Sequence, residues 1–287
     1  MLLLEESDVV DGVCDGLVDA AENLGMFPEI ARQIQQLSFK KMASIPDLEV
    51  IVSRDVALTA RILRLANSPY YGGRRTVTAL RHALVSIGYV DAVQISLALA
   101  MTSVLVRHPR SHLVMAHSAR TAVIARELAR HTRALEPPEA FVAGMLHDLG
   151  KVVLLEAVGQ SYAEVLERPG LTEPERLAAE RHLAHVDHAV LGEQCLKRWR
   201  FSCGTTLAVR NHHQPEMTHG LEGRPAFCAD ALIALADWVE HAYTDSGTSG
   251  LAAAIVAHPC NVPLEIDDAR AVEAVDVIQT ELSALSG

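Results

Sequence analysis

The sequence predicts an all-α fold, and three observations support this prediction. Apolar residues make up 49% of the 287-residue chain but aromatic residues only 4%, and Ala, Leu and Val dominate. This composition suits packed helices better than a β-sandwich. Strict alternation of apolar and polar residues, the pattern of a half-buried strand, is nearly absent. Apolar residues instead recur at helical spacing along most of the chain.

The first quarter of the chain predicts a series of short helices. One helix covers residues 7–24 and ends at Gly25, and Pro28 starts the next at a position where its missing N–H costs nothing. Asp47 and Asp55 are predicted to cap the two helices that follow, because a short carboxylate can accept hydrogen bonds from the first free N–H groups.

The next segment contains a break between two longer helices. Asn67-Ser68-Pro69 ends a helix, and Tyr70-Tyr71-Gly72-Gly73 predicts a tight loop. A helix then runs from Thr78 to Gly88, and Asp91 opens a long one with a continuous apolar stripe. We expect Asn67 to cap backbone groups, Pro69 to stiffen the turn and Tyr70 to pack against the next helix.

The segment His108-Pro109-Arg110-Ser111 is the best internal boundary. It separates an N-terminal helical bundle, residues 1–108, from a second helical region, residues 109–287, that holds almost all the candidate ligands. In this second region we predict helices over 113–131 and 229–241 and a flexible loop over 244–250.

Charge and cysteine content limit the classes of partner. The net charge is −11, so nucleic acid and anionic membranes are not the expected partners. The five cysteines are odd in number and show no C-x-x-C spacing, which favours a reducing compartment. The acidic N-terminus is unlike a signal peptide, and no uncharged apolar run could span a bilayer. These features predict a cytoplasmic protein with no membrane partner.

The arginines of the N-terminal half could form a local basic patch, but a solvated helix face is the favoured interpretation. They are Arg61, Arg64, Arg74, Arg75 and Arg81.

Seven residues that can bind metal lie in the second half, several of them on segments that otherwise predict buried helix. Burying so many imidazoles and carboxylates is costly unless they pair with one another or with an ion. Their order is typical of a two-metal phosphohydrolase centre, and the mixed nitrogen and oxygen donors suit iron, manganese, zinc or nickel. The set is His117, His147, Asp148, His188, His212, His213 and Asp237.

The segment around His147 and Asp148 is the most specific part of the set. We expect one helix to end at Gly150, with His147 and Asp148 on its last turn and Asp148 free to bridge two metals through its two oxygens. Lys151 could neutralise a phosphate. It could equally be a cation that complements a helix C-terminus.

Sequence spacing supports convergence of the other ligands. His212 lies 24 residues beyond His188, and Asp237 lies 24 beyond His213. Intervals of this length match pairs of helices that return to the same end of a bundle.

Each of these residues taken singly has a structural explanation as well. His117 could be a core histidine, His212-His213 an exposed helix end, and Asp237 a charge on a helix face, whereas Asp187 is predicted to be an N-cap. Only the ordered set favours a metal centre.

Two groups of motifs together resemble the HDOD family, the HD-related output domains. The first is the run from Leu58 to Tyr71 followed by Arg81-His82-Ala83-Leu84 and Ile87-Gly88. The second is His117-Ser118, the run from Ala143 to Lys151, Asp187-His188 with Gly192 and Trp199, and His212-His213 with Pro215. The resemblance covers roughly residues 25–240.

The resemblance implies an N-terminal helical bundle joined to an HD-type helical domain, within the HD superfamily of metal-dependent phosphohydrolases. It implies that one metal is held by His117, His147, Asp148 and Asp237. It implies that a second metal is held by Asp148, His188, His212 and His213. HDOD members are mostly regarded as signalling output modules of bacteria.

The related HD-GYP branch hydrolyses cyclic di-GMP, and this chain departs from it. Gln214 follows His213 where that branch has a glutamate, and no Gly-Tyr-Pro follows. The usual HDOD pattern is also altered at Val56 and His185, where proline and glycine are common.

Two functions follow as hypotheses. The first is a bacterial signalling protein that acts through protein partners or a bound ligand, a nucleotide being one candidate, with or without the metal centre. The second is a metal-dependent phosphohydrolase acting on a nucleotide or cyclic nucleotide, in which two metals activate a water molecule, Asp148 bridges them and Lys151 steadies the phosphate.

Overall fold

The computed structural model shows an all-α protein and confirms the predicted fold class. Every element of regular secondary structure in the described part of the chain is a helix. The described residues are 6–23, 28–38, 40, 42–71, 76–102, 109–214 and 225–285.

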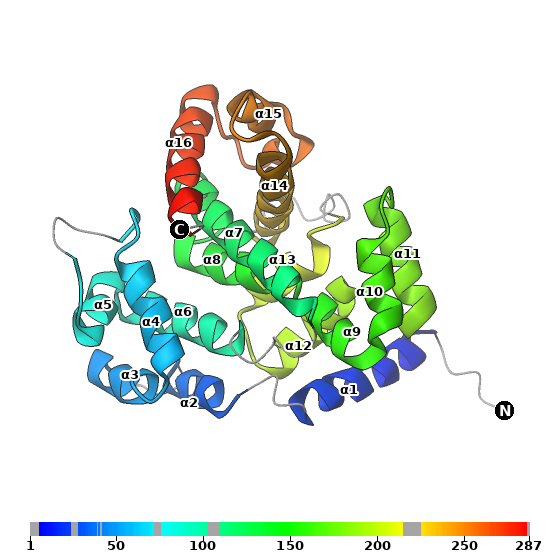
Figure 1. Cartoon of the computed structure of the whole chain (residues 1–287), viewed down its shortest axis with the longest axis horizontal. Coiled ribbons are helices and arrows are strands. Elements are labelled where there is room, and N and C mark those ends of the chain that lie inside the picture. The colour runs from blue at the N-terminus through cyan, green and yellow to red at the C-terminus, as the bar shows by residue number, and fades with distance from the viewer. Residues whose placement is uncertain are drawn as a thin grey trace.

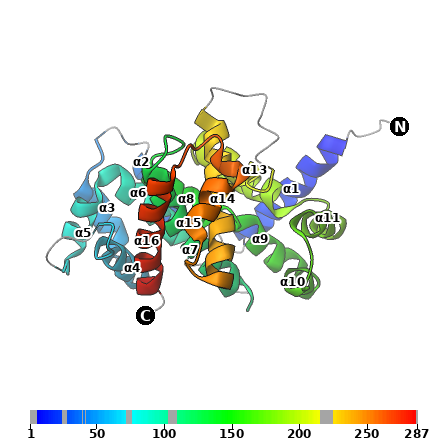
Figure 2. The ribbon, with the colours of Figure 1, turned by 90° about the horizontal axis from the view of Figure 1, so that it is seen from above.

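Five helices of the N-terminal half pack together at one end of the molecule (Figures 1 and 2). Their buried faces carry apolar residues at helical spacing, such as Leu58, Ile62 and Ala66. The helices are α2 (Glu29–Ser38), α3 (Ile45–Val52), α4 (Val56–Ala66), α5 (Leu80–Ile87) and α6 (Tyr89–Thr102).

The second half begins with seven helices and ends with a further group that folds back over α7. The first group is α7 (Ser111–Arg130), α8 (Pro137–Leu146), α9 (Leu149–Val158), α10 (Gln160–Glu167), α11 (Glu173–Ala184), α12 (His188–Arg198) and α13 (Cys203–Asn211). The last group is α14 (Pro225–Ser246), α15 (Leu251–Ala257), the 3₁₀-helix η2 (Pro259–Asn261) and α16 (Asp268–Leu285).

The first helix, α1 (Glu6–Asn23), packs against α9 and α12 of the second half (Figure 1). Arg198 on α12 pairs with Asp15 and Asp19 of α1, and the Trp199 indole N–H donates to Glu22. The predicted division at residue 108 stays a prediction, because residues 103–108 lie outside the described part of the chain.

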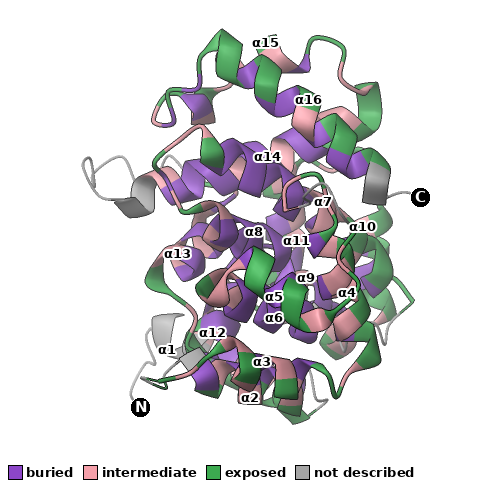
Figure 3. Cartoon of the chain, turned by 90° about the vertical axis from the view of Figure 1, so that its left-hand side faces the viewer, coloured by how far each residue is buried: buried purple, intermediate pink, exposed green. Residues whose placement is uncertain are grey.

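Helices α7 and α8 form the centre of the molecule, and α8 is almost wholly buried (Figure 3). Gly144 makes their close contact feasible, since a Cβ atom there would lie 2.8 Å from the Ala122 Cα. The neighbour that this glycine admits is α7. This crossing places the C-terminal end of α8 in the middle of the domain.

The end of α8 differs from the prediction. The helix ends at Leu146 rather than at Gly150, His147 and Asp148 form a turn, and α9 begins at Leu149. Gly150 is therefore in the first turn of α9, where its missing side chain lets the His188 backbone approach. A Cβ at Gly150 would lie 2.0 Å from the His188 carbonyl oxygen, so only glycine allows α9 and α12 to meet here.

Two predicted N-caps are confirmed and one is wrong. Asp55 caps α4 by accepting from Leu58 N, and Asp187 caps α12 by accepting from Val190 N. Ser44, not Asp47, is the N-cap of α3, and Asp47 instead completes the capping box from the third helical position.

The predicted loop at 244–250 is shorter than expected, because α14 continues to Ser246. Other predicted breaks, at Gly25, Gly72-Gly73 and Pro215, lie outside the described residues. Among the described helices, none is by itself long and apolar enough to cross a membrane; α5 and the first part of α6 reach that composition only as a pair bent by 113°.

Candidate metal centre

The seven predicted ligands come from five parts of the second half and meet at one place. His117 lies on α7, His147 and Asp148 on the turn between α8 and α9, and His188 at the start of α12. His212 and His213 follow the end of α13. The seventh, Asp237, lies on α14.

Four of these side chains form a first cluster. The Nε2 atom of His117 lies 3.2 Å from His147 Nε2, 2.9 Å from Asp237 Oδ1 and 3.7 Å from Asp148 Oδ2. His147 Nε2 is 3.5 Å from Asp148 Oδ2 and 3.7 Å from Asp237 Oδ1. Two imidazole nitrogens and two carboxylate oxygens thus face a common point.

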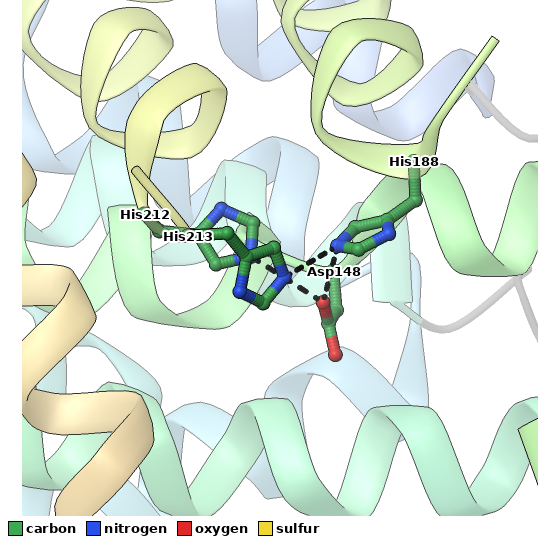
Figure 4. Close-up of side chains that lie close together, drawn as sticks. All are labelled: Asp148, His188, His212 and His213. Carbon is green, nitrogen blue, oxygen red and sulfur yellow. Dashed lines mark hydrogen bonds and ion pairs between the residues drawn. The ribbon is translucent and has the colours of Figure 1, made fainter. Parts of the chain in front are cut away.

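A second cluster lies on the other side of Asp148 (Figure 4). His188 Nε2 is 2.9 Å from His213 Nε2 and 3.5 Å from Asp148 Oδ1, and His212 Nε2 is 3.8 Å from the same oxygen. One ligand atom from each of these four residues lies within 4.8 Å of the others. The two oxygens of Asp148 therefore serve different clusters, Oδ2 the first and Oδ1 the second.

Two atoms of the second cluster are buried without a partner. Asp148 Oδ1 and His212 Nε2 have no hydrogen bond among the described residues, although both residues are at most 2% exposed. A buried polar atom without a partner costs about 1–3 kcal/mol. A cation between them would satisfy both atoms, so the donor set fits a metal ion.

The outer nitrogens of the buried imidazoles are held by backbone carbonyls or carboxylates. His147 Nδ1 donates to Gly144 O and His212 Nδ1 to Val209 O, each over 2.7 Å. A carbonyl oxygen only accepts, so the proton of each neutral ring is on Nδ1 and the Nε2 lone pair points to the centre. Metal-binding histidines are oriented in this way.

Glu180 on α11 orients the ring of His188 in the same way. Its Oε2 atom accepts from both the ring Nδ1 of His188, over 2.7 Å, and the backbone N, over 2.8 Å. The hydroxyl of Tyr162 donates to the other oxygen of Glu180 over 2.7 Å. All three side chains are buried.

Glu240 on α14 holds His117. Its Oε2 atom accepts from His117 Nδ1 over 2.7 Å, and its other oxygen accepts from Arg120. His241, also on α14, lies at the exposed edge of the first cluster, with Nδ1 3.5 Å from Asp237 Oδ1. Asp237, Glu240 and His241 share one helix face by their spacing.

The charges of the cluster suit neutral imidazole ligands. Burial and the neighbouring histidines lower the pKa of His212 to about 3, and burial lowers the pKa of His147 and His213 as well. Burial alone would raise the pKa of Asp148, but the histidines and Lys151 around it outweigh burial and hold that pKa well below its usual value. Metals bind the deprotonated forms of both ligand types.

His117 and His188 have the opposite tendency. Burial opposes the charge of His188, but Glu180 outweighs burial and raises its pKa. Burial opposes the charge of His117, but Asp237 and Glu240 outweigh burial and raise its pKa to about 10. A divalent ion would replace the ring proton that faces Asp237.

Lys151 lies beside the centre in the first turn of α9. Its Nζ atom is 3.0 Å from Asp148 Oδ2. A cation in the first turn does not complement a helix C-terminus, so that explanation is wrong. Burial would lower the pKa of Lys151, but Asp148 outweighs burial and raises it, which keeps the side chain charged.

A cavity of about 330 Å³ adjoins the second cluster and reaches His213. Arg181, Arg210 and His185 line it together with apolar residues of α11 and α12. Glu173 lies on the same side, with Oε1 3.1 Å from His213 Nε2. Asp187 also lines the cavity and pairs with Arg181 over 2.7 Å, and Arg210 pairs with Glu193 over 3.4 Å. The cavity therefore joins charged and apolar surface to the edge of the centre.

The sequence interpretation missed Glu173, Glu180 and Glu240. Glu240 had a local signal, because it follows Asp237 by one helical turn. Glu173 and Glu180 had none, since only the packing of α11 brings them to the histidines.

Comparison with known proteins agrees with this architecture. The HDOD domain model matches residues 24–215. The chain belongs to the HDOD family. A relative from Treponema pallidum (strain Nichols), an uncharacterised protein, is 26% identical over 209 residues; the match covers 69% of this chain and 39% of the relative, so the chain spans well under half of that protein.

Three solved structures share this fold. A provisionally named phosphohydrolase from Shewanella amazonensis SB2B has a TM-score of 0.71 at 18% identity, with 93% of this chain and 97% of that chain covered. An HDOD domain protein of unknown function from Geobacter sulfurreducens has a TM-score of 0.66 at 24% identity, with 90% and 91% covered. A provisionally named signal transduction protein from Marinobacter aquaeolei VT8 has a TM-score of 0.64 at 18% identity, with 100% and 68% covered.

These similarities show that the chain shares its fold with these three proteins.

Proposed function

We propose that this HDOD chain is a regulatory protein that holds two divalent transition metals and binds a phosphorylated small ligand beside them. The observation that carries the proposal is the orientation of Asp148. Its two oxygens face two different sets of imidazole nitrogens, and the oxygen in the second set has no other partner among the described residues. A carboxylate shared in this way would contribute to holding both ions.

The donors suggest how the two ions would be divided. His117, His147 and Asp237 would hold one ion with Asp148. The remaining three histidines would hold the other with Asp148. Iron, manganese, zinc or nickel fits this mixture of nitrogen and oxygen donors. Such ions, when bound, polarise a phosphoryl oxygen and lower the pKa of a water molecule.

The residues beside the centre favour an anionic ligand. Lys151 stays charged next to Asp148, and the cavity at His213 contains Arg181 and Arg210. A phosphate at the centre would leave the rest of the ligand in this cavity, where apolar residues such as Val186 and Val190 are available. A nucleotide has this combination of a phosphate and a partly apolar body.

The first experiment is elemental analysis of protein purified without a metal-chelating column and then dialysed against each metal. We expect about two ions per chain for the wild type and at least one fewer for Asp148→Ala. Asp230→Asn is the matched control, because Asp230 is a buried carboxylate of α14 outside the two clusters. A wild type that takes up no metal would contradict the proposal.

The second experiment measures ligand binding by calorimetry. The probes are inorganic phosphate, nucleoside monophosphates and cyclic di-GMP, added to the manganese-loaded protein. We expect binding that disappears in Asp148→Ala and weakens in Lys151→Gln. Affinity that is the same in the wild type and Asp148→Ala would place the ligand elsewhere.

Hydrolysis is the second candidate function, and the charged Lys151 beside the bridging carboxylate favours it. The assay uses manganese- or iron-loaded protein with linear dinucleotides, nucleoside phosphates and cyclic di-GMP. We expect little or no cleavage of cyclic di-GMP, because Gln214 replaces the carboxylate expected after His213. Robust cleavage of cyclic di-GMP that is lost in Asp148→Ala would make the chain an enzyme rather than a binding module.

A further inference from the structure

A cavity of about 590 Å³ lies between the two halves of the protein, away from the metal centre. Its walls come from α4, α6 and residues 67–69 on one side and from α7, α8 and α16 on the other. Protein interiors contain few voids larger than a water molecule. A hollow of this size is in the range of small-molecule sites.

Most of the wall is apolar. Met115, Ala119 and Val123 line it from α7, and Phe141 and Met145 line it from α8. Ala119 contributes only a methyl group, which leaves the space that a larger side chain would fill. An apolar wall of this kind favours the hydrocarbon part of a ligand.

A buried carboxylate with an unused oxygen lies in the wall of this cavity. Glu281 of α16 lines the cavity and is 4% exposed. Its Oε2 atom accepts from the buried Arg126, but Oε1 has no hydrogen-bond partner among the described residues. The hydroxyl of Ser68, on the opposite wall, is also buried without a partner. Both groups could accept a hydrogen bond from a ligand.

The exposed rim of the cavity is polar as well, and it is cationic. Arg64 is exposed on α4 and has no ion pair among the described residues, and Arg61 lies one turn earlier with a bond to Leu99 O. His112 lies at the same exposed rim. Glu281 is the one acidic residue in the described wall. The arginines expected to form a solvated helix face therefore include two that border a cavity.

We propose that this cavity binds an amphipathic organic anion that also carries a hydroxyl or amino group. The anionic group would pair with Arg61 and Arg64, the hydrocarbon body would cover the α7 and α8 walls, and the hydroxyl or amino group would donate to Glu281 Oε1. This proposal does not depend on the metal centre. Its test is therefore independent of the tests of the proposed function. Helix α7 carries His117, and α8 ends immediately before His147. A ligand in this cavity would therefore contact the two helices that position these two candidate metal ligands.

The probe for the test is ω-hydroxydodecanoate, titrated into the full chain by calorimetry. We expect sub-millimolar affinity. Dodecanediol, which lacks the anion, and dodecanoate, which lacks the hydroxyl, should each bind at least about tenfold more weakly, because a charge-assisted hydrogen bond contributes about one factor of ten or more. Equal affinity for all three probes would overturn the proposal. ω-Hydroxydodecyl phosphate distinguishes the headgroup: tighter binding than the carboxylate identifies a phosphate ligand, and weaker binding a carboxylate ligand.

Protein variants place the ligand in the cavity. The double substitution Arg61→Gln with Arg64→Gln should weaken binding of the probe at least about tenfold, whereas Arg54→Gln, an exposed arginine of the same half that is absent from the cavity wall, should not. Ala119→Phe should abolish binding while the helical circular dichroism spectrum is retained. Unchanged binding in folded Ala119→Phe protein would show that the probe binds elsewhere. Concentration-dependent dimerisation of the wild type that Ala119→Phe abolishes, together with no binding of the probe, would mean that a second copy of the chain covers the cavity, and would overturn the proposal as well.

Discussion

Glu180 shows how one carboxylate controls a candidate ligand. It accepts from two nitrogens of His188 and from Tyr162. Burial would raise its pKa, but these donors outweigh burial and lower the pKa to about 2, so the carboxylate stays charged. The ring of His188 is thereby held with Nε2 towards Asp148.

The substitution Glu180→Gln should therefore reduce metal affinity without removing a ligand. We expect a loss of about 10–100-fold, as is typical when the partner of a metal-binding histidine is changed. Competition with a fluorescent chelator measures it. Glu193→Gln is the control, because Glu193 is a mostly buried carboxylate of α12 that pairs with Lys197 instead. An equal loss in both variants would refute the specific role of Glu180.

Asp230 leads to a prediction about how the free energy of unfolding depends on pH. Burial raises its pKa to about 7, although the Asn211 side chain donates to one of its oxygens. The folded state then holds a proton that the unfolded state releases near pH 4, so the free energy of unfolding falls as the pH rises from about 4 to 7. Asp230→Asn should remove this loss and stabilise the protein at pH 8 by roughly 1–3 kcal/mol.

Urea denaturation of the wild type and Asp230→Asn at pH 5.5 and pH 8 tests this prediction. The difference in unfolding free energy between the two proteins should be larger at pH 8. A difference that is constant with pH would show that Asp230 does not titrate in this range.

At the scale of the element, the junction of α8 and α9 decides where the centre forms. The sequence predicted His147 and Asp148 on the last turn of one helix, but they lie on a turn between two helices. This turn directs Asp148 between both sets of histidines, and Gly150 lets α12 approach so closely that His188 joins them.

Gly150→Ala should accordingly destabilise the fold by about 1–3 kcal/mol or more, because the new methyl group would overlap the His188 carbonyl and force α9 and α12 apart. Gly12→Ala on α1 is the matched control. Nothing lies within 4 Å of a Cβ at that position, so it should stabilise the protein by about 0.5–1 kcal/mol. Thermal denaturation of both variants measures the effects, and a neutral Gly150→Ala would contradict the close crossing.

The loop after α4 is a second element with a defined structural role. The Asn67 side chain donates to Leu63 O and Val77 O and accepts from Val77 N, which joins the end of α4 to the chain beyond the loop. This confirms its predicted capping role. The ring centroid of Tyr70 lies 4.2 Å from the guanidinium carbon of Arg126 on α7. The expected packing of Tyr70 against the next helix stays a prediction.

Tyr70→Ala should lower the melting temperature more than it lowers the affinity for any partner, because it removes the aromatic cover of a buried guanidinium. We expect a loss of about 1–3 kcal/mol, with Tyr70→Phe close to the wild type because it keeps the stacked ring. Normal melting of Tyr70→Ala combined with lost partner binding would identify the loop as an interaction surface.

At the scale of the whole molecule, the proposed ions would connect elements that are far apart in the sequence. The ligands span residues 117 to 237 and come from α7, α12, α14, the turn after α8 and the end of α13. A metal that binds the folded state alone stabilises it in proportion to the logarithm of its concentration.

Manganese or zinc at about 100 times its dissociation constant should therefore add about 2.7 kcal/mol and raise the melting temperature by several degrees. A chelator should reverse the shift, and Asp148→Ala should show none. An equal shift in Asp148→Ala would indicate that the metal binds outside the candidate centre.

The sequence by itself determined many of the helices, two of their N-caps and the members of the metal-type set. Periodicity of apolar residues and caps such as Asp55 and Asp187 act within one or two helical turns, so they are visible in the local sequence. The resemblance to HDOD domains also predicted which ligands belong to each cluster, and the distances around Asp148 agree with that division.

Only the tertiary structure decided how the helices meet. It brought Glu180 and Glu173 to the histidines, placed α1 on the second half and left a cavity beside Glu281. These features depend on which helix faces pack together, and that choice depends on the shapes of many side chains at once. Contacts between residues distant in the chain have no local signal, so the partners of His188 could be identified only after folding.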